Sequence, residues 1–314
     1  MQISSAASIA AAAILDPGRD FVAVLAVSIV LATLAATQRI ATLGYVAEAL
    51  GDGERSIGAA VVGWGGALGN VIGGALCLFL IDLIGWQPAL LALALVMLGF
   101  AAVILAVAEP KAAAPVSSGI PLLRTLRRED IRRAIVIVAP ATFGVAVAFA
   151  MIQPRMVDLG FGLTDIGVTI AATHLLAFTL VGPVVARLAR RTAPLRSIAL
   201  GGLLLAPGFA ALTLADDLLG AYGSALAAVV FVFCALAVQN IAFTTYFFSL
   251  AGSGEVATEV TLLTATMSAL ALLGFASSGF IAGALGYVAT LVIAATGYAV
   301  TAALASRWRP AAAT

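Results

Sequence analysis

The sequence predicts an all-α membrane protein with nine full transmembrane helices, arranged as two helical bundles related by a parallel repeat. Composition is the first reason: of 314 residues, 63% are hydrophobic and 10% are charged, and the mean hydropathy is +1.15. A soluble domain of this composition would expose large apolar patches. The apolar runs are also about 20 residues long, enough to cross a hydrocarbon core of about 30 Å. Finally, part of the chain recurs at a fixed offset.

The apolar runs define nine expected spans. They cover residues 21–49, 56–81, 87–108, 133–153, 164–187, 197–215, 222–250, 257–283 and 287–306. One long connection, residues 109–132, begins rich in Pro, Ala and Ser and ends in a basic stretch. It predicts a flexible linker followed by a surface helix. The linker divides the chain into an incomplete first bundle, residues 1–108, and a six-helix second bundle, residues 133–314.

The repeat relates residues 38–86 to residues 239–287 without gaps. Eleven of the 49 aligned positions, about 22%, are identical. Chance pairing in such a biased composition would give about 9%. The identical pairs are Gln38/Gln239, Ile40/Ile241, Ala41/Ala242, Tyr45/Tyr246, Gly51/Gly252, Gly53/Gly254, Glu54/Glu255, Gly73/Gly274, Ala75/Ala276, Phe79/Phe280 and Gly85/Gly286. Symmetry between hydrophobic segments is typical of transporters that hold their substrate between two related bundles.

The same offset of 201 residues pairs Met1 with Gly202, in the middle of the sixth span. Residues 1–15 are therefore expected to form the back half of a truncated span. By this offset, two spans and part of a third, about 70 residues, are missing upstream. A misplaced start and a true remnant both explain this arrangement.

Basic and acidic residues segregate to opposite ends of the spans. Arginines gather in the 109–132 connection, between residues 187 and 196, and in the C-terminal tail, whereas aspartates dominate the connections on the other side. By the positive-inside rule, the basic ends lie in the cytoplasm. The C-terminus is then cytoplasmic.

Several segments carry a family resemblance. The stretches TQRIATLGY (37–45) and GDGERSIGAAVVGWGGALGNVIGG (51–74) resemble the fourth to sixth spans of the muropeptide permease and siderophore importer branch of the major facilitator superfamily. MVDLGFGLTDIGV (156–168) and GPVVARLARR (182–191) resemble the seventh and eighth spans with their cytoplasmic turn. The nine spans would then be the fourth to twelfth of twelve.

The resemblance implies a secondary transporter that works by alternating access. The expected location is the bacterial inner membrane, and the expected partners are a small-molecule solute and the lipid bilayer. Neither nucleic acid nor a cofactor is implied, and a monomer is expected.

Four positions depart from the branch pattern. Similar proteins carry an aspartate after the Thr-Gln pair and another four residues later, where this chain has Arg39 and Leu43. Val145 stands where an acidic residue is common in the seventh span, and Arg190 replaces the acid in the turn after the eighth. All fifteen carboxylates lie at or near span ends or in loops, so the sequence assigns no proton carrier.

Mid-span polar side chains are the candidates for solute binding. They are Arg39, Gln38 and Tyr45 in the first full span, and Gln239, Asn240 and Tyr246 at or beside the matching positions of the repeat. Gln38, Thr42 and Tyr45 share one helix face by their spacing. Because an arginine inside a membrane costs about 2.5–3.5 kcal/mol without water or a partner, Arg39 is expected to face a cavity and attract an anionic group. The alternative is that these side chains bind one another between helices, with Arg39 reaching the cytoplasmic interface.

Two further features lie inside the spans. His174 is the single histidine, and it is a candidate proton relay because imidazole titrates near neutrality. The alternative is a histidine bonded to the backbone of a neighbouring helix. Gly65, Gly69 and Gly73 lie on one helix face at a spacing of four residues, which predicts close helix packing.

Other functional classes find little support. One histidine and no mid-span acid cannot supply the converging groups of an enzyme site. Cys77 and Cys234 lie in apolar runs, which predicts inert thiols and neither a disulfide nor a metal site. A secondary transporter for a polar, siderophore-like or muropeptide-like solute is the favoured function. A non-transporting truncated remnant is the first alternative, and a polytopic membrane enzyme is the second.

Overall fold

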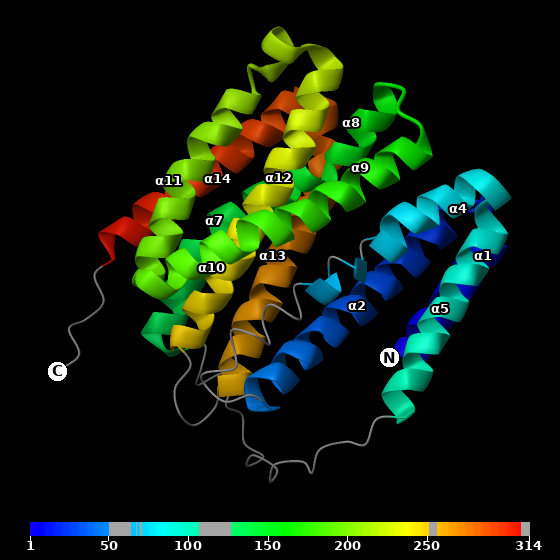
Figure 1. Cartoon of the computed structure of the whole chain (residues 1–314), viewed down its shortest axis with the longest axis horizontal. Coiled ribbons are helices and arrows are strands. Elements are labelled where there is room, and N and C mark those ends of the chain that lie inside the picture. The colour runs from blue at the N-terminus through cyan, green and yellow to red at the C-terminus, as the bar shows by residue number, and fades with distance from the viewer. Residues whose placement is uncertain (50–63, 67, 70, 107–126, 251–255, 309–314) are drawn as a thin grey trace.

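The computed structural model describes residues 1–49, 64–66, 68–69, 71–106, 127–250 and 256–308, and within these ranges the chain is helical almost throughout. Nine of the described helices are long and apolar enough to cross a membrane. The predicted all-α membrane fold and its number of spans are thus confirmed. Figure 1 shows the helices in two groups, the first part of the chain on one side and the later part on the other.

The first helix group contains α1 (Gln2–Ile14), α2 (Phe21–Ala49), the π-helical η1 (Val71–Leu76), α4 (Cys77–Ile84) and α5 (Trp86–Ala106). α1 covers most of the expected half-span and packs against α5 and α2. The indole N–H of Trp86 donates to the Ala12 carbonyl at 3.1 Å. Ala12, Ala13, Cys77 and Leu90 form a small apolar core around this bond, in which Cys77 is a free thiol.

The second helix group contains α7 (Glu129–Ala150), α8 (Ile152–Asp158), α9 (Leu163–Leu176), the π-helical η2 (Ala177–Val181), α10 (Gly182–Arg191), α11 (Pro194–Leu212), α12 (Ala215–Leu250), α13 (Val256–Leu285) and α14 (Tyr287–Arg307). α7 starts earlier than the expected residue 133, because Glu129 and Asp130 in its first turn suit the positive end of the helix dipole. α12 is broken at Gly220, so its straight part begins close to the expected residue 222. The expected surface helix before α7 falls largely outside the described residues.

Within the second group, α7 and α14 pack with their backbones in close contact. Pro140 interrupts α7, because proline has no N–H and its ring disturbs the helical ladder. Thr301 of α14 bridges the interruption: its hydroxyl accepts from the Ala141 N–H at 3.1 Å and donates to the Ile137 carbonyl at 2.8 Å. One turn earlier, Gly297 lies so close to the Pro140 carbonyl that a Cβ would overlap it. α7 and α14 are thus joined through their backbones.

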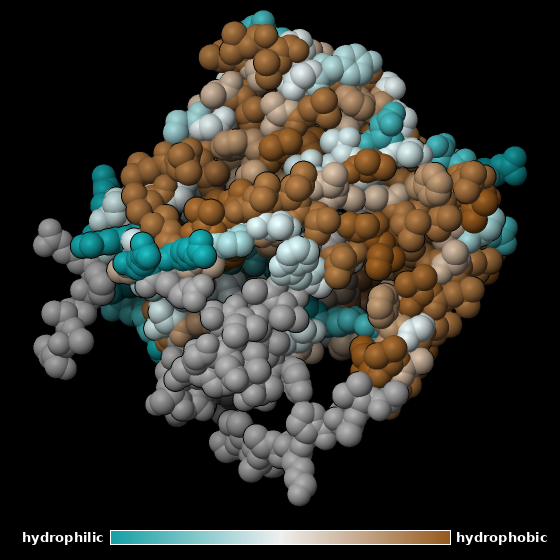
Figure 2. Space-filling model, viewed as in Figure 1, coloured by the Kyte–Doolittle hydropathy of each residue, from teal (hydrophilic) through white to brown (hydrophobic). Residues whose placement is uncertain are grey.

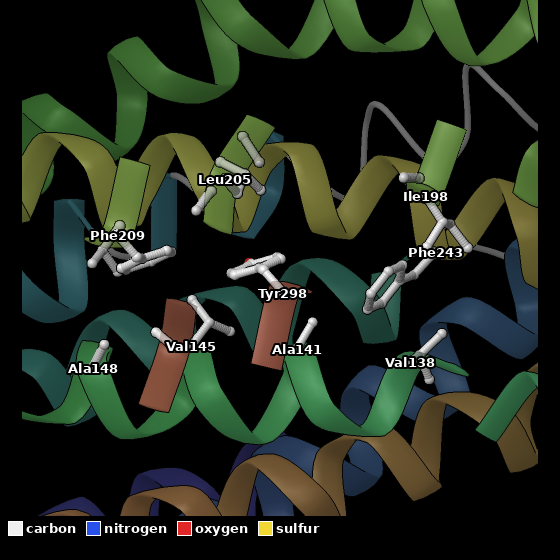
Figure 3. Close-up of a cluster of buried hydrophobic side chains, with 14 of the residues drawn as sticks. Val138, Ala141, Val145, Ala148, Ile198, Leu205, Phe209, Phe243 and Tyr298 are labelled. Carbon is white, nitrogen blue, oxygen red and sulfur yellow. The ribbon is translucent and has the colours of Figure 1, made fainter. Parts of the chain in front are cut away.

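Tyr298 is at the centre of the second group's core. Figure 3 shows its ring between α7 and α11, beside Phe209. The two rings are stacked with centroids 5.5 Å apart. The tyrosine hydroxyl donates to Oε1 of Gln239 on α12 at 2.8 Å. One side chain of α14 therefore contacts the helices that make up most of this core.

The turn glycines of the repeat share one backbone conformation. Gly85, between α4 and α5, has φ 85° and ψ 172°. Its mate Gly286, between α13 and α14, has φ 80° and ψ 169°. Only glycine adopts this region without strain. The repeat seen in the sequence therefore recurs in the geometry of its turns.

The helices of the repeat differ in how they are packed. Gly274 of α13 faces α7, where a Cβ would lie 2.8 Å from Ala146 Cβ and 2.9 Å from the Phe143 carbonyl oxygen. Its mate Gly73 has no described atom within 4 Å of that position, and the same holds for Gly65 and Gly69. The close packing predicted for this glycine stripe is therefore wrong as far as the described residues go.

The two groups touch along two lines. α2 contacts α13, and η1 and α4 contact α9; Figure 1 shows α2 running towards α13 below α9. A Cβ on Gly167 of α9 would lie 3.0 Å from Ala75 Cα of η1, so these backbones nearly touch. The Thr164 hydroxyl donates to Oδ2 of Asp82 on α4 at 2.8 Å. The π-helical segments η1 and η2 belong to the two spans of this contact, where π-helical turns often mark functional sites.

Alanine substitution should have different effects on stability at Gly73 and at its repeat mate Gly274. Gly274→Ala should lower the melting temperature, because the added methyl group meets α7 and overpacking costs about 1–3 kcal/mol. Gly73→Ala should leave it unchanged or raise it, since helix propensity improves by up to about 1 kcal/mol. Thermal unfolding in detergent measures both. Equal effects of the two substitutions would mean that the mates are packed alike.

Limited proteolysis should show that the first helix group, which is less tightly packed, is cut more readily than the second. The apolar window Phe21–Arg39 of α2 is 0% buried, whereas that of α12 is 50% buried. Helices with few packed neighbours open more readily. Expressed alone, the chain should be cut mainly within residues 1–120, inside α2 and α4 as well as in the connections, while the later spans resist. Mass spectrometry of the fragments tests this, and equal protection of both groups would contradict it.

Candidate functional site

Arg39 has the surroundings of an unpaired charge. It lies on α2, ten residues before Ala49, about 15 Å along the helix from that end. Its side chain is exposed, and its guanidinium makes no hydrogen bond or ion pair with any described residue. Figure 2 shows the surface hollowed below α9, between the two groups, with hydrophilic atoms in the hollow. Exposure alone does not distinguish a side chain that faces water from one that faces lipid, so the expectation that Arg39 faces a cavity stays a prediction.

Gln38 faces a different direction from Arg39. The half-buried side chains Val24, Val27, Leu31 and Leu34 follow helical spacing along α2, and Gln38 continues their stripe. Arg39 lies about 100° further around the helix. The Thr42 hydroxyl is bonded to the Gln38 carbonyl at 2.9 Å and is not offered to a neighbour. The side chain of Tyr45 lies outside the described residues.

Gln239 and Tyr246 are not on an open lining. Both are buried within the second group, where Gln239 accepts the hydrogen bond from Tyr298. The cavity beside Gln239 is about 10 Å³, room for about one water molecule. The expectation that Gln239 and Tyr246 line a solute cavity together with Gln38 is therefore wrong. The helix that carries them, α12, is enclosed by α7, α9, α10 and α11, whereas α2 has few neighbours. Asn240 is half-buried and has no hydrogen bond to a described residue.

His174 is held by aromatic rings. It lies in the last turn of α9, with ring centroids 5.0 Å from Phe178 and 4.9 Å from Phe233. Its Nδ1 atom is buried and has no hydrogen-bond partner among the described residues. The alternative of a bond to a neighbouring backbone is therefore wrong within the described part of the chain. The same surroundings give the proposed relay no neighbouring carboxylate there.

An aromatic pocket includes Phe233, the ring that also packs against His174. We use this name for a cavity of about 100 Å³ lined by Phe149, Ala150, Ile152, Gln153, Ile170 and Phe233. Phe149 and Phe233 pack edge to face with centroids 5.6 Å apart. The walls come from α7, α8, α9 and α12, which are distant in the chain, so no local pattern in the sequence predicted this pocket.

A buried carboxylate lies at the basic end of the second group. The Glu259 side chain is 6% exposed and pairs with Arg128, which also bonds Asp130 at 2.6 Å and the Leu250 carbonyl at 3.3 Å. The hydrogen bond to Asp130, together with the charges of Asp130 and Glu259, raises the pKa of Arg128. The sequence placed Glu259 correctly at a span end but gave no sign of its burial, because Arg128 precedes it by more than 100 residues.

A second polar cluster lies at the opposite, acidic end. Arg155 pairs with Asp216 and donates to the Ser224 hydroxyl at 2.7 Å. The Tyr287 hydroxyl donates to Asp158 at 2.5 Å. Both clusters join helices within the second group. Neither cluster includes Arg39 or a residue that lines the aromatic pocket.

The role of Gln239 can be tested through its partner. Tyr298→Phe keeps the stacked ring but leaves the buried glutamine oxygen without its donor. We expect a loss of about 0.6–1.7 kcal/mol in stability, the range for hydrogen bonds inside membranes, with transport unchanged. Thermal unfolding and uptake assays on the same preparation measure the two effects. A loss of uptake at unchanged stability would return Gln239 to the solute site.

Comparison with known proteins agrees with this architecture. The sequence profile of the Major Facilitator Superfamily matches residues 1–271. Two similar solved structures are a Major Facilitator Superfamily transporter, FucP, in the outward conformation, with a TM-score of 0.62, and a single-residue variant of the E. coli fucose:proton symporter FucP, with a TM-score of 0.61. In each case the identity is 15%, and the match covers 98% of this chain and 82% of that chain.

At this identity the structural likeness shows the fold alone. The match to the family profile is at the level of the superfamily and does not support the muropeptide permease and siderophore importer branch. The profile covers most of the chain, and nine apolar helices within the described residues agree with it. The protein is thus a multi-pass membrane transporter and not an enzyme. It belongs to the Major Facilitator Superfamily.

Proposed function

We propose that this transporter moves a polar small solute with an anionic group across the bacterial inner membrane, by alternating access between its two helix groups. The observation that carries the proposal is the guanidinium of Arg39, exposed within a span and unpaired among the described residues. Such a charge is costly to keep in a membrane helix, about 2.5–3.5 kcal/mol, unless it serves water or a ligand. A carboxylate or phosphate accepts two parallel hydrogen bonds from it.

The charge of Arg39 also bears on the class of solute. Fucose, named for the structurally similar E. coli symporter, is a neutral sugar, whose hydroxyl groups can accept from a guanidinium but carry no opposite charge to strengthen the bond. Solutes with carboxylate or phosphate groups would gain a charge-assisted bond. Siderophore-like and muropeptide-like anions remain the classes that the sequence resemblance favours. Asn240 and Gln38 are secondary candidates for contact with the solute, and His174 is a candidate relay for protons.

The remaining architecture fits this proposal. The groups on either side of the linker, residues 1–108 and 133–314, would act as the two moving bodies of a monomer. They meet through α2 and α13, and through η1 and α4 against α9. Their basic ends would face the cytoplasm by the positive-inside rule, which also places the C-terminus there.

Removing the charge tests the proposal. Arg39→Gln should lower uptake of anionic solutes about 10- to 100-fold, because a hydrogen bond to a charged group contributes about 1.5–3 kcal/mol. Arg39→Lys should keep part of the activity. Uptake of labelled carboxylates and phosphates into proteoliposomes, normalised to the amount of protein in the membrane, gives the measurement.

Arg19→Gln is the matched control, because Arg19 is 88% exposed and, among the described residues, pairs with Asp16 one turn away. It should leave uptake unchanged. Unchanged uptake in Arg39→Gln would assign Arg39 to the membrane interface. Absence of uptake by the unaltered chain would favour the non-transporting alternative.

A further inference from the structure

The aromatic pocket has the size and lining of a ligand site. An engineered apolar cavity of about 150 Å³ binds benzene, and the aromatic pocket, at about 100 Å³, is of the same order and is open on one side. Five of its six lining residues are apolar, and one is polar. Apolar walls with few polar groups are typical of small-molecule sites.

The walls of the pocket are fixed before any ligand arrives. Phe233 is 1% exposed and lies between Phe149 and His174. Phe149 in turn contacts Phe275 of α13, with centroids 6.0 Å apart. Because each wall ring is held by another ring, binding requires little ordering of side chains, which favours affinity.

Gln153 marks the mouth of the pocket. It lies on α8, just after the break between α7 and α8, and it is exposed while Ile152, Ile170 and Phe233 are buried. Its side-chain amide makes no hydrogen bond with the described residues, so two N–H donors and one oxygen acceptor are available to a ligand. The pocket therefore presents an interior walled by two phenylalanine rings, with a hydrogen-bonding group at its opening.

We propose that the aromatic pocket is a solute subsite that takes a six-membered ring, with Gln153 binding a polar substituent on that ring. The inference rests on the proposed function and narrows its solute class to anions that also carry a ring. Arg39 lies on α2 and the pocket lies on the second helix group, so the two can be tested separately.

A neutral ring probe tests the subsite separately from Arg39. We choose 4-fluorobenzamide, whose amide can pair with Gln153, and follow its binding to the full chain in nanodiscs by ¹⁹F NMR. Ala150→Leu should weaken saturable binding at least about tenfold, because the added side chain fills the cavity. Ala211→Leu, on the exposed face of α11, is the matched control and should not change binding.

A second variant keeps the test independent of any folding defect. Gln153→Ala changes an exposed side chain, and it should weaken 4-fluorobenzamide about 2- to 10-fold, the effect of one hydrogen bond, while leaving fluorobenzene unchanged. Binding that is not saturable, or that Ala150→Leu leaves intact, would overturn the inference. Arg39→Gln should leave binding of this uncharged probe intact. A failed subsite and a failed Arg39 role thus give different results.

Discussion

The structure depends on the hydrogen-bonded contact between α7 and α14 at Pro140. Proline in a membrane helix frees backbone groups that lipid cannot satisfy, so a neighbouring helix must supply the partners. Thr301 does so at Pro140, by accepting from one side of the interruption and donating to the other. Gly297 makes the approach possible, and Tyr298 next to it reaches α11 and α12. One short segment of α14 therefore contacts α7, α11 and α12.

The two halves of the repeat have the same turns but different surroundings. Gly85 and Gly286 share their backbone angles, yet Gly73 faces no described neighbour where Gly274 is packed against α7. In a membrane, helix association relies on close packing and hydrogen bonds, since lipid is as apolar as the side chains. The second group has many such contacts. The first group has fewer, and its α2 carries Arg39, which has no partner among the residues that the structure describes.

The arrangement of polar groups separates structural roles from functional ones. Arg128 and Arg155, at opposite ends of the second group, are satisfied by carboxylates and are positioned to hold helices together. Gln239 is satisfied by a tyrosine in the core. Arg39, Gln153 and His174 have no polar partner among the described residues; Gln153 lines the aromatic pocket, and His174 packs against Phe178 and Phe233. Unsatisfied groups in such places are the ones that a solute or a proton can use.

The sequence by itself determined the membrane location, the nine spans and the repeat, because hydrophobic length and turn glycines are local properties that neighbouring helices do not alter. It also made Arg39 a candidate for solute binding, since a charge inside an apolar run is conspicuous. It could not decide what Gln38 and Gln239 face: identical residues at matched positions acquire different neighbours once α12 is enclosed and α2 is not. Nor could it reveal the aromatic pocket or the burial of Glu259, because these arise where helices far apart in the chain meet. Such contacts depend on tertiary packing, which no local pattern of residues encodes.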